Sequence, residues 1–206
     1  SWEEAAALPL AGLTAYRAVF SRAQLQPHEK ILITGIGAGT ATLALQFAVA
    51  AGAVPCVTSS STAKLDRAHQ LGARAGALYN VHGWAAEFAK SHGPFDVIVD
   101  SAGGPGINDL IDLAAPGGRI VFFGATRGNL PDVAWRKLFW KQISLLGTTM
   151  GSPADFEAMV AFVRKHAIKP VVSEVFALND VLAAFERMER SEEHTSELKS
   201  HHDLVC

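Results

Sequence analysis

Cysteine is scarce in this sequence: among its 206 residues only Cys56 and Cys206 carry a thiol. Cys56 falls in a stretch that we expect to be a strand, and Cys206 is the last residue. Two cysteines placed in this way exclude the class of small secreted domains built on disulfides. They favour a reducing compartment, and we expect a cytoplasmic location.

Long apolar runs and an excess of charge of one sign are also missing. No run approaches the roughly 18 apolar residues of a transmembrane helix, and the first residues show neither methionine nor a basic-then-apolar leader, so no signal peptide is expected. The sequence has 18 Lys and Arg against 20 Asp and Glu, a net charge of −2. This balance gives no reason to expect nucleic acid or a membrane surface as a partner.

What the sequence does contain is apolar: 49% of its residues are hydrophobic and 18% are charged, which suits a packed core. The length predicts a single α/β domain over residues 1–190. Residues 191–206 lack an apolar period and resemble the translated read-through of a sequencing adapter, so we expect a non-native tail there. His194, His201 and His202 lie in this tail, and we predict no metal site.

Strand-like and helix-like patterns alternate along the chain. A parallel sheet covered on both faces, the doubly wound α/β (Rossmann) architecture, follows from this alternation. The helix expected after Ser152 has Pro153 in its first turn and a buried stripe that includes Phe156 and Met159. Strands are expected at 31–33, 54–58, 75–79, 95–100, 119–123 and 143–146. Helices are expected to start at Thr40 and at Pro153, and to cover 62–71, 84–91, 107–113 and the region around 135–140.

The stretch around which the sheet is organised is the glycine turn after the first strand. Gly35, Gly37 and Gly39 follow three bulky strand residues and precede an apolar helix that starts at Thr40. A helix that begins just after such a turn points N–H groups and a partial positive charge at a phosphate. The dinucleotide fingerprint is degenerate, because its third glycine is replaced by Thr40 or Ala41 in either frame. A turn that merely joins strand to helix is the alternative.

The end of the second strand carries hydroxyl groups where a carboxylate would select NAD. Thr58, Ser59, Ser60 and Ser61 are followed by Lys64, and no acid occurs between residues 54 and 65. Hydroxyls and a lysine suit the 2′-phosphate of NADP(H), because they donate hydrogen bonds and offset its charge. The alternative is that the serines cap the next helix.

The later strands end in small or polar residues. Asp100 ends the fourth strand, where a cap for the strand end is favoured over a catalytic acid. Gly124 and Ala125 follow the fifth strand and leave room for a flat ligand. The sixth strand leads to Thr148 and Met150, which could lie beside a nicotinamide. The sequence identifies no catalytic acid–base pair.

Several motifs together resemble the cofactor domain of the medium-chain dehydrogenase/reductase family, in its zinc-independent, quinone-oxidoreductase-like branch. They include Ala6-Ala-Leu-Pro-Leu-Ala-Gly-Leu-Thr-Ala-Tyr16, Val97-Ile-Val-Asp-Ser-Ala-Gly-Gly104, Pro116-Gly-Gly-Arg-Ile-Val-Phe-Phe-Gly124 and Leu145-Leu-Gly-Thr-Thr-Met-Gly151. The resemblance implies NADPH-dependent hydride transfer to a quinone, enone or carbonyl substrate.

The resemblance also assigns roles. It implies a pyrophosphate site at Gly37, Ala38, Gly39 and Thr40. It implies that Ser59, Ser60, Lys64 and Tyr79 hold the adenosine phosphate. It implies a nicotinamide site formed by Thr14, Gly124, Ala125, Thr148 and Met150. It further implies a homodimer through the edge strand at 143–146, which runs from Ile143 to Leu146.

Two departures from the family pattern matter. Leu10 stands where zinc alcohol dehydrogenases of the family have a cysteine ligand, and a leucine cannot bind Zn²⁺. The N-terminal substrate domain of the family is not in this sequence, so we expect a fragment that binds cofactor but is inactive alone.

Three alternatives stay open at this point. One is the cofactor domain of a zinc-type alcohol dehydrogenase. Another is an S-adenosylmethionine-dependent methyltransferase, whose first motif resembles Gly35-x-Gly37-x-Gly39 but whose second strand would end in an acid. The third is a protein that senses NADPH without catalysis.

Overall fold

The computed structural model describes residues 1–189 of the chain. Within these residues the chain forms a six-stranded, wholly parallel sheet with the order β3-β2-β1-β4-β5-β6. The direction of winding reverses between β1 and β4, as in a doubly wound fold, and the expected architecture is confirmed. The strands are β1 (Lys30–Ile33), β2 (Val54–Ser59), β3 (Ala75–Leu78), β4 (Phe95–Asp100), β5 (Ala114–Phe122) and β6 (Ser144–Gly147).

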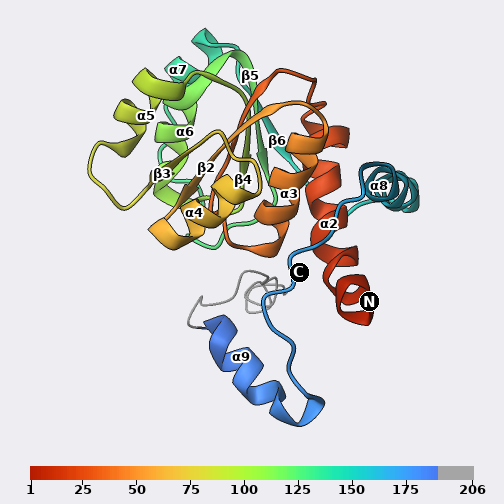
Figure 1. Ribbon diagram of the computed structural model, residues 1–206. Coiled ribbons are helices and arrows are strands. Elements are labelled where there is room, and N and C mark those ends of the chain that lie inside the picture. The colour runs from red at the N-terminus through yellow and green to blue at the C-terminus, as the bar shows by residue number, and fades with distance from the viewer. Residues whose placement is uncertain (190–206) are drawn as a thin grey trace.

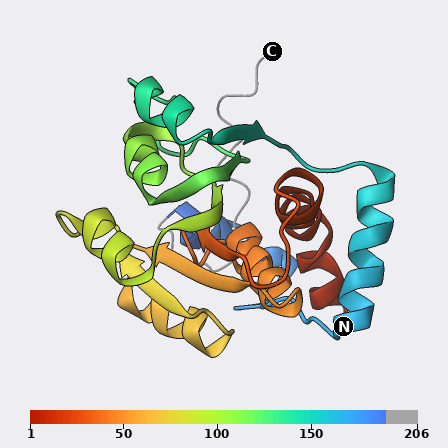
Figure 2. The ribbon, with the colours of Figure 1, turned by 90° about the horizontal axis from the view of Figure 1, so that it is seen from above.

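Helices cover both faces of the sheet (Figures 1 and 2). One face carries α2 (Pro9–Tyr16), α3 (Gly39–Ala50) and α4 (Thr62–Gln70), with α8 (Pro153–His166) packed outside α2. The other face carries α5 (Trp84–His92), α6 (Ile107–Leu113) and α7 (Trp135–Trp140). The remaining elements are α1 (Trp2–Ala7), α9 (Val181–Glu189), the π-helix η1 (Arg17–Arg22) and the 3₁₀ turns η2 (Gly104–Gly106) and η3 (Leu178–Asp180).

The expected tail at 191–206 lies outside the described residues, as does residue 190. In the part of the chain that is described, no helix has the length and apolarity needed to cross a membrane.

The central strand β1 is buried on both faces because α-helices pack against each side of it. Ile31 and Ile33 face the cluster under α2 and α3, whereas Leu32 faces the cluster under α5 and α6. All three side chains are inaccessible to solvent. This explains the continuous apolar run, in place of an alternating pattern, that marks β1 in the sequence.

Aromatic side chains join α3 to the helices outside it. The Phe47 ring of α3 lies 6.1 Å from the Tyr16 ring and 5.8 Å from the Phe162 ring, centroid to centroid, in edge-on contacts. Phe20 lies 4.9 Å from Phe162 in the same cluster. Aromatic pairs at these separations contribute beyond the apolar area that they bury. This cluster fixes α2 and α8 against the helix that leads away from the glycine turn.

Two details differ from the sequence-based expectations. β5 begins at Ala114 instead of residue 119, because Ala114 pairs with Phe95 before a register shift lets residues 115–118 bulge out of the sheet. Pro116 has no N–H for the ladder, which suits a bulge. On α8, Phe156 was expected in the buried stripe but is 38% exposed. Phe162 is in contact with the core instead, since α8 packs on α2 and η1 through Met159 and Phe162.

A charged cluster fixes the start of α8. Asp155 and Ser152 form a reciprocal capping box, as expected from the Ser152 cap. The Asp155 carboxylate also accepts hydrogen bonds of 2.5 Å from the Arg17 guanidinium and from the Ser21 hydroxyl. Hydrogen bonds from Ser21 and Ser152, with the Arg17 contact, hold the pKa of Asp155 well below its usual range. The π-helical turn η1 carries both Arg17 and Ser21, so this turn and α8 are joined through one carboxylate.

Candidate functional site

The glycine turn lies at the carboxyl edge of the sheet, at the position where the winding reverses. Gly35 has a φ of +65° and Gly37 a φ of +112°, values that L side chains rarely adopt. The turn leads into α3, whose N-cap residue is Ala38 and whose first turn has no side-chain cap. The positive end of the α3 dipole therefore faces the turn, as in sites for a phosphate group.

Hydrogen bonds join the glycine turn to the end of β2. The Ile36 amide donates to the Thr58 carbonyl at 2.8 Å. The Ser59 hydroxyl donates to the Ile36 carbonyl at 3.4 Å and accepts from the Ser61 amide at 3.2 Å. Ser59 is buried, and its hydroxyl already has these two local partners, whereas Ser60 is exposed. Of the two serines predicted to hold a phosphate, Ser60 presents the accessible hydroxyl.

Lys64 lies beside the glycine turn, and Tyr79 lies beside the end of β2. The aliphatic chain of Lys64 crosses Gly37 so closely that a Cβ at Gly37 would be 2.5 Å from Lys64 Cδ. The Tyr79 amide donates to the Ser59 carbonyl at 3.0 Å, and Tyr79 itself is exposed. The next side chain reinforces this junction, since Asn80 Nδ2 donates to the Ser60 carbonyl at 3.4 Å. The structure thus brings together the side chains predicted to hold the adenosine phosphate.

Asp100 closes the end of β4. The residue is 3% exposed, and its carboxylate accepts a hydrogen bond of 2.5 Å from the Thr34 hydroxyl and one of 2.7 Å from the Gly103 amide. Burial raises the pKa of Asp100, and the two hydrogen bonds oppose that shift. Both oxygens are in use, one at the glycine turn and the other at the β4 loop. Asp100 therefore acts as a cap for the strand end, the interpretation that the sequence favoured.

The loops after β4 and β5 touch each other. A Cβ at Gly124 would be 2.7 Å from the Ser101 carbonyl oxygen, and one at Gly103 would be 3.4 Å from Ala125 Cα. Arg127, which sequence reasoning missed, follows in the β5 loop, and its Cζ atom lies 5.9 Å from the centre of the Tyr79 ring. No local pattern in the sequence signals a contact between residues this far apart in the chain.

The residues predicted beside the nicotinamide come from three parts of the chain: α2, the loop after β5 and the segment after β6. The Thr14 hydroxyl on α2 donates to the Leu10 carbonyl at 3.1 Å and lies 3.9 Å from Met150 Sδ. The Thr148 amide donates to the Phe122 carbonyl at 2.9 Å, which places Thr148 beside the end of β5. The Thr148 hydroxyl oxygen is buried and has no hydrogen-bond partner. A buried polar atom without a partner is costly, and a bound ligand is one way to satisfy it.

The described residues do not form a metal site of their own. Among the described residues, no group of three or more His, Cys, Asp or Glu side chains could hold a metal ion. Leu10, at the position that the resemblance gives to a cysteine ligand, is 46% exposed and offers only hydrocarbon.

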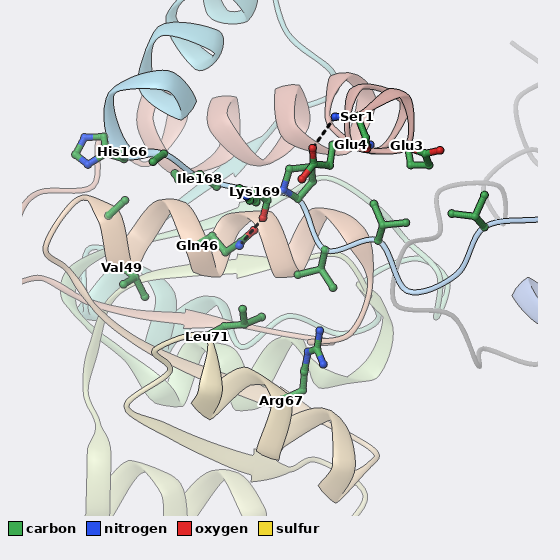
Figure 3. A pocket seen from close by; sticks show the side chains of 16 residues that line it. Ser1, Glu3, Glu4, Gln46, Val49, Arg67, Leu71, His166, Ile168 and Lys169 are labelled. Carbon is green, nitrogen blue, oxygen red and sulfur yellow. Dashed lines mark hydrogen bonds and ion pairs between the residues drawn. The ribbon is translucent and has the colours of Figure 1, made fainter.

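A hollow in the described part of the chain lies elsewhere (Figure 3). Its volume is about 1040 Å³, and it lies between α1, the C-terminal ends of α3 and α4, and the segment after α8. Val49, Ala50 and Leu71 line it, and they lie at the opposite helix ends from the glycine turn. Gln46 also lines the hollow, and its Nε2 atom donates a hydrogen bond to the Lys169 carbonyl at 2.9 Å. This hollow is therefore separate from the carboxyl edge of the sheet.

The sheet order, the glycine turn and the first turn of α3 define a doubly wound cofactor-binding domain. The family model described as zinc-binding dehydrogenase matches residues 39–165. The chain belongs to this family, which is part of the medium-chain dehydrogenases/reductases. The family assignment confirms the broader resemblance seen in the sequence.

Individual relatives agree with this assignment. A zinc-type alcohol dehydrogenase-like protein YogA of Leptosphaeria maculans is 38% identical over 177 residues, which are 82% of this chain and 49% of that protein. Quinone oxidoreductase-like protein 2 of Rattus norvegicus is 29% identical over 90% of this chain and 56% of its own length. A crystal structure of an NAD-dependent alcohol dehydrogenase superposes with a TM-score of 0.86 at 33% identity, over 93% of this chain and 56% of that one. The chain spans about half the length of the curated relatives it matches.

Proposed function

We propose that this chain is the cofactor-binding part of an NADPH-dependent oxidoreductase that transfers hydride to a quinone, enone or carbonyl substrate. The observation that carries the proposal is the left-handed Gly37 turn that leads into the start of α3, with Ala38 as the N-cap residue. A pyrophosphate at this position would receive backbone N–H groups and the helix dipole. The family assignment supports an oxidoreductase and sets aside the methyltransferase alternative.

The residues present fit a nicotinamide dinucleotide. In this proposal Gly37, Ala38, Gly39 and Thr40 hold the pyrophosphate. The nicotinamide ring lies among Thr14, Gly124, Ala125, Thr148 and Met150, where the buried Thr148 hydroxyl oxygen lacks a protein partner. When bound, the cofactor supplies the hydride.

The protein's part in this proposal is to orient the cofactor and to exclude water. Gly124 supports this role, since the β4 and β5 loops meet there with no room for a side chain. Asp100 holds the glycine turn and the β4 loop in register and takes no part in proton transfer, because both of its oxygens are engaged.

The choice of NADP(H) over NAD(H) depends on the residues after β2. The solved structure reported above is of an NAD-dependent enzyme. In this chain, however, the strand that would carry the NAD-selecting acid ends in serines. Ser60 is exposed, Lys64 lies across the turn, and Tyr79 adjoins Ser59. These groups suit a 2′-phosphate, which needs donors and positive charge.

We predict that the chain binds NADPH more tightly than NADH and that Lys64→Ala narrows this preference about tenfold, because one charge-assisted contact to phosphate is lost. Titration of the reduced-nicotinamide fluorescence against each variant measures both affinities. Lys90→Ala, at an exposed position on α5, is the matched control and should leave the ratio unchanged. Equal affinity of the unaltered chain for the two cofactors would contradict the proposal.

The zinc-independent branch is part of the proposal, and Leu10 supports it. The cofactor domain of a zinc-type alcohol dehydrogenase is the second candidate, favoured by the names of the family and of the Leptosphaeria relative. Metal analysis of the full-length protein would separate the two. The cytoplasmic location stays a prediction from cysteine usage.

We further propose a homodimer formed through β6, the strand at one edge of the sheet. Leu145 and Leu146 are half-buried, and β6 pairs with β5 on one side. Nearby, α7 exposes Trp135, Phe139 and Trp140, at 65%, 63% and 79%. An unpaired strand edge next to an exposed apolar group of this kind marks an interaction surface.

Sedimentation equilibrium tests the dimer. We expect twice the chain mass, and we expect Trp140→Glu to shift the protein toward monomer by at least tenfold in the dissociation constant, because it places a charge in an apolar contact. Trp2→Glu, at a residue that is 89% exposed on α1, is the control and should leave the mass unchanged. A monomer at high concentration, or equal behaviour of the two variants, would count against this interface.

A further inference from the structure

Arg127 reaches over the carboxyl edge of the sheet. It lies in the loop after β5, yet its guanidinium carbon is 5.9 Å from the centre of the Tyr79 ring, which directly follows β3. In the sheet, β2, β1 and β4 lie between these two strands. The side chain therefore extends from one half of the doubly wound sheet to the other, across the edge where ligands bind in such folds.

The backbone of Arg127 is held in place by the loop after β4. The Arg127 amide donates to the Ala102 carbonyl at 2.8 Å. Gly104 has a φ of +65°, and a Cβ there would be 2.5 Å from the Arg127 carbonyl oxygen and 2.9 Å from Arg127 Cβ. The two loops can pack this closely only because residue 104 has no side chain. The backbone and Cβ of Arg127 are thereby held at the carboxyl edge of the sheet.

The guanidinium itself is weakly engaged. Arg127 is exposed, and within residues 1–189 we find no ion pair between it and a carboxylate. Asp100 is close enough for the Arg127 charge to affect its pKa, but its oxygens are bonded to Thr34 and Gly103. An exposed contact between a cation and an aromatic ring is weak. The guanidinium could therefore bind an anion without breaking a strong interaction.

The position of the Arg127 guanidinium indicates which anion it would bind. Tyr79 is joined to the end of β2 through the Ser59 carbonyl, and Asn80 is joined to it through the Ser60 carbonyl. This is the side of the glycine turn where Ser60 and Lys64 lie, beyond the start of α3. An anion held here is displaced from the helix N-terminus toward β3. It matches the phosphate on the adenosine ribose better than the pyrophosphate.

We propose that Arg127 determines cofactor specificity by binding the 2′-phosphate of NADP(H), with the Tyr79 ring holding its guanidinium in position. The inference rests on the proposed function and adds a residue from the opposite half of the sheet to Ser60 and Lys64. The planar guanidinium can donate two parallel hydrogen bonds to a phosphate, which a lysine cannot do. Together with Lys64 it supplies two positive charges to a group that carries nearly two negative charges.

Fluorescence titration with NADPH and NADH tests this inference. We expect Arg127→Ala to weaken NADPH binding about tenfold while NADH binding changes less than twofold, because only NADPH carries the 2′-phosphate. Arg127→Lys, which keeps the charge but not the planar fork, should give an NADPH affinity between those of the unaltered chain and Arg127→Ala. Arg74→Ala, an exposed arginine next to the opposite end of β3, is the matched control. Circular dichroism checks that every variant is folded.

The outcomes separate the two proposals. If the unaltered chain prefers NADPH and Arg127→Ala keeps the same ratio, the role of Arg127 is wrong and the proposed function stands. If Arg127→Ala weakens NADPH and NADH equally, Arg127 binds the part common to both, and the inference is again overturned. If the unaltered chain binds neither cofactor, or both equally, the proposed cofactor fails and the inference fails with it.

Discussion

Gly37→Ala is expected to weaken NADPH binding about 100-fold, the largest effect on binding that we predict. Gly37 has a φ of +112°, so an L side chain there is strained in any surroundings. A methyl group would also lie 2.5 Å from Lys64 Cδ. Lys64 would have to move away from the turn, and the new carbon would occupy the approach to the first turn of α3. Fluorescence titration with NADPH measures the loss.

The matched control for Gly37→Ala is Gly106→Ala. Gly106 ends the short turn η2, has a φ of −72°, and a Cβ there would meet no atom within 4 Å. Its substitution should leave binding unchanged. If Gly37→Ala is folded, as judged by circular dichroism, and still binds NADPH with the affinity of the unaltered chain, the phosphate does not lie at this turn.

Asp155→Ala is expected to lower the free energy of unfolding by about 3 kcal/mol at neutral pH. The change removes a helix cap, which contributes about 1 kcal/mol, and charge-assisted hydrogen bonds from Arg17 and Ser21 worth about 2 kcal/mol more. Urea unfolding, followed by circular dichroism, measures the difference. Asp66→Ala, at an exposed position on α4, is the control and should cost less than 0.5 kcal/mol by the usual behaviour of surface sites.

The loss of unfolding free energy caused by Asp155→Ala should depend on pH. The pKa of Asp155 is lowered in the folded chain, so its carboxylate stabilises the fold above the pKa of the unfolded state. The difference in unfolding free energy between the unaltered chain and Asp155→Ala is therefore complete at pH 6–7. It should shrink as the pH falls below about 4, the unfolded value for an aspartate. A difference that is constant between pH 7 and pH 3 would show that the ionised carboxylate contributes little.

The strands were the most predictable part of this molecule. β1, β2 and β4 are continuous apolar runs flanked by turn residues, and their observed bounds lie within a residue of those expected. Buried parallel strands have this signature because both of their faces are covered. The early start of β5 was missed because Ala114 pairs with Phe95 through a bulge that contains a proline, a residue that normally argues against a strand.

Contacts between distant residues were not predictable from local patterns. The sequence indicated that Ser152 caps α8, but nothing near Asp155 shows that it also binds Arg17, 138 positions earlier. The same holds for Arg127 and Tyr79, which meet only because the loops after β3 and β5 converge at one edge of the sheet. The site residues inferred from family resemblance are gathered at that edge, and their roles stay predictions until a cofactor is titrated.

The strand order has a consequence for how this chain acquires its structure during synthesis. β1 is made early, but one of its two neighbours is β4, which ends only at Asp100. Until that point has left the ribosome, the apolar strand with Ile31 and Ile33 has one side unpaired. Non-local parallel pairing of this kind is slow, and it leaves nascent strands open to aggregation. Truncations that end before β4 should therefore be recovered in inclusion bodies or bound to chaperones.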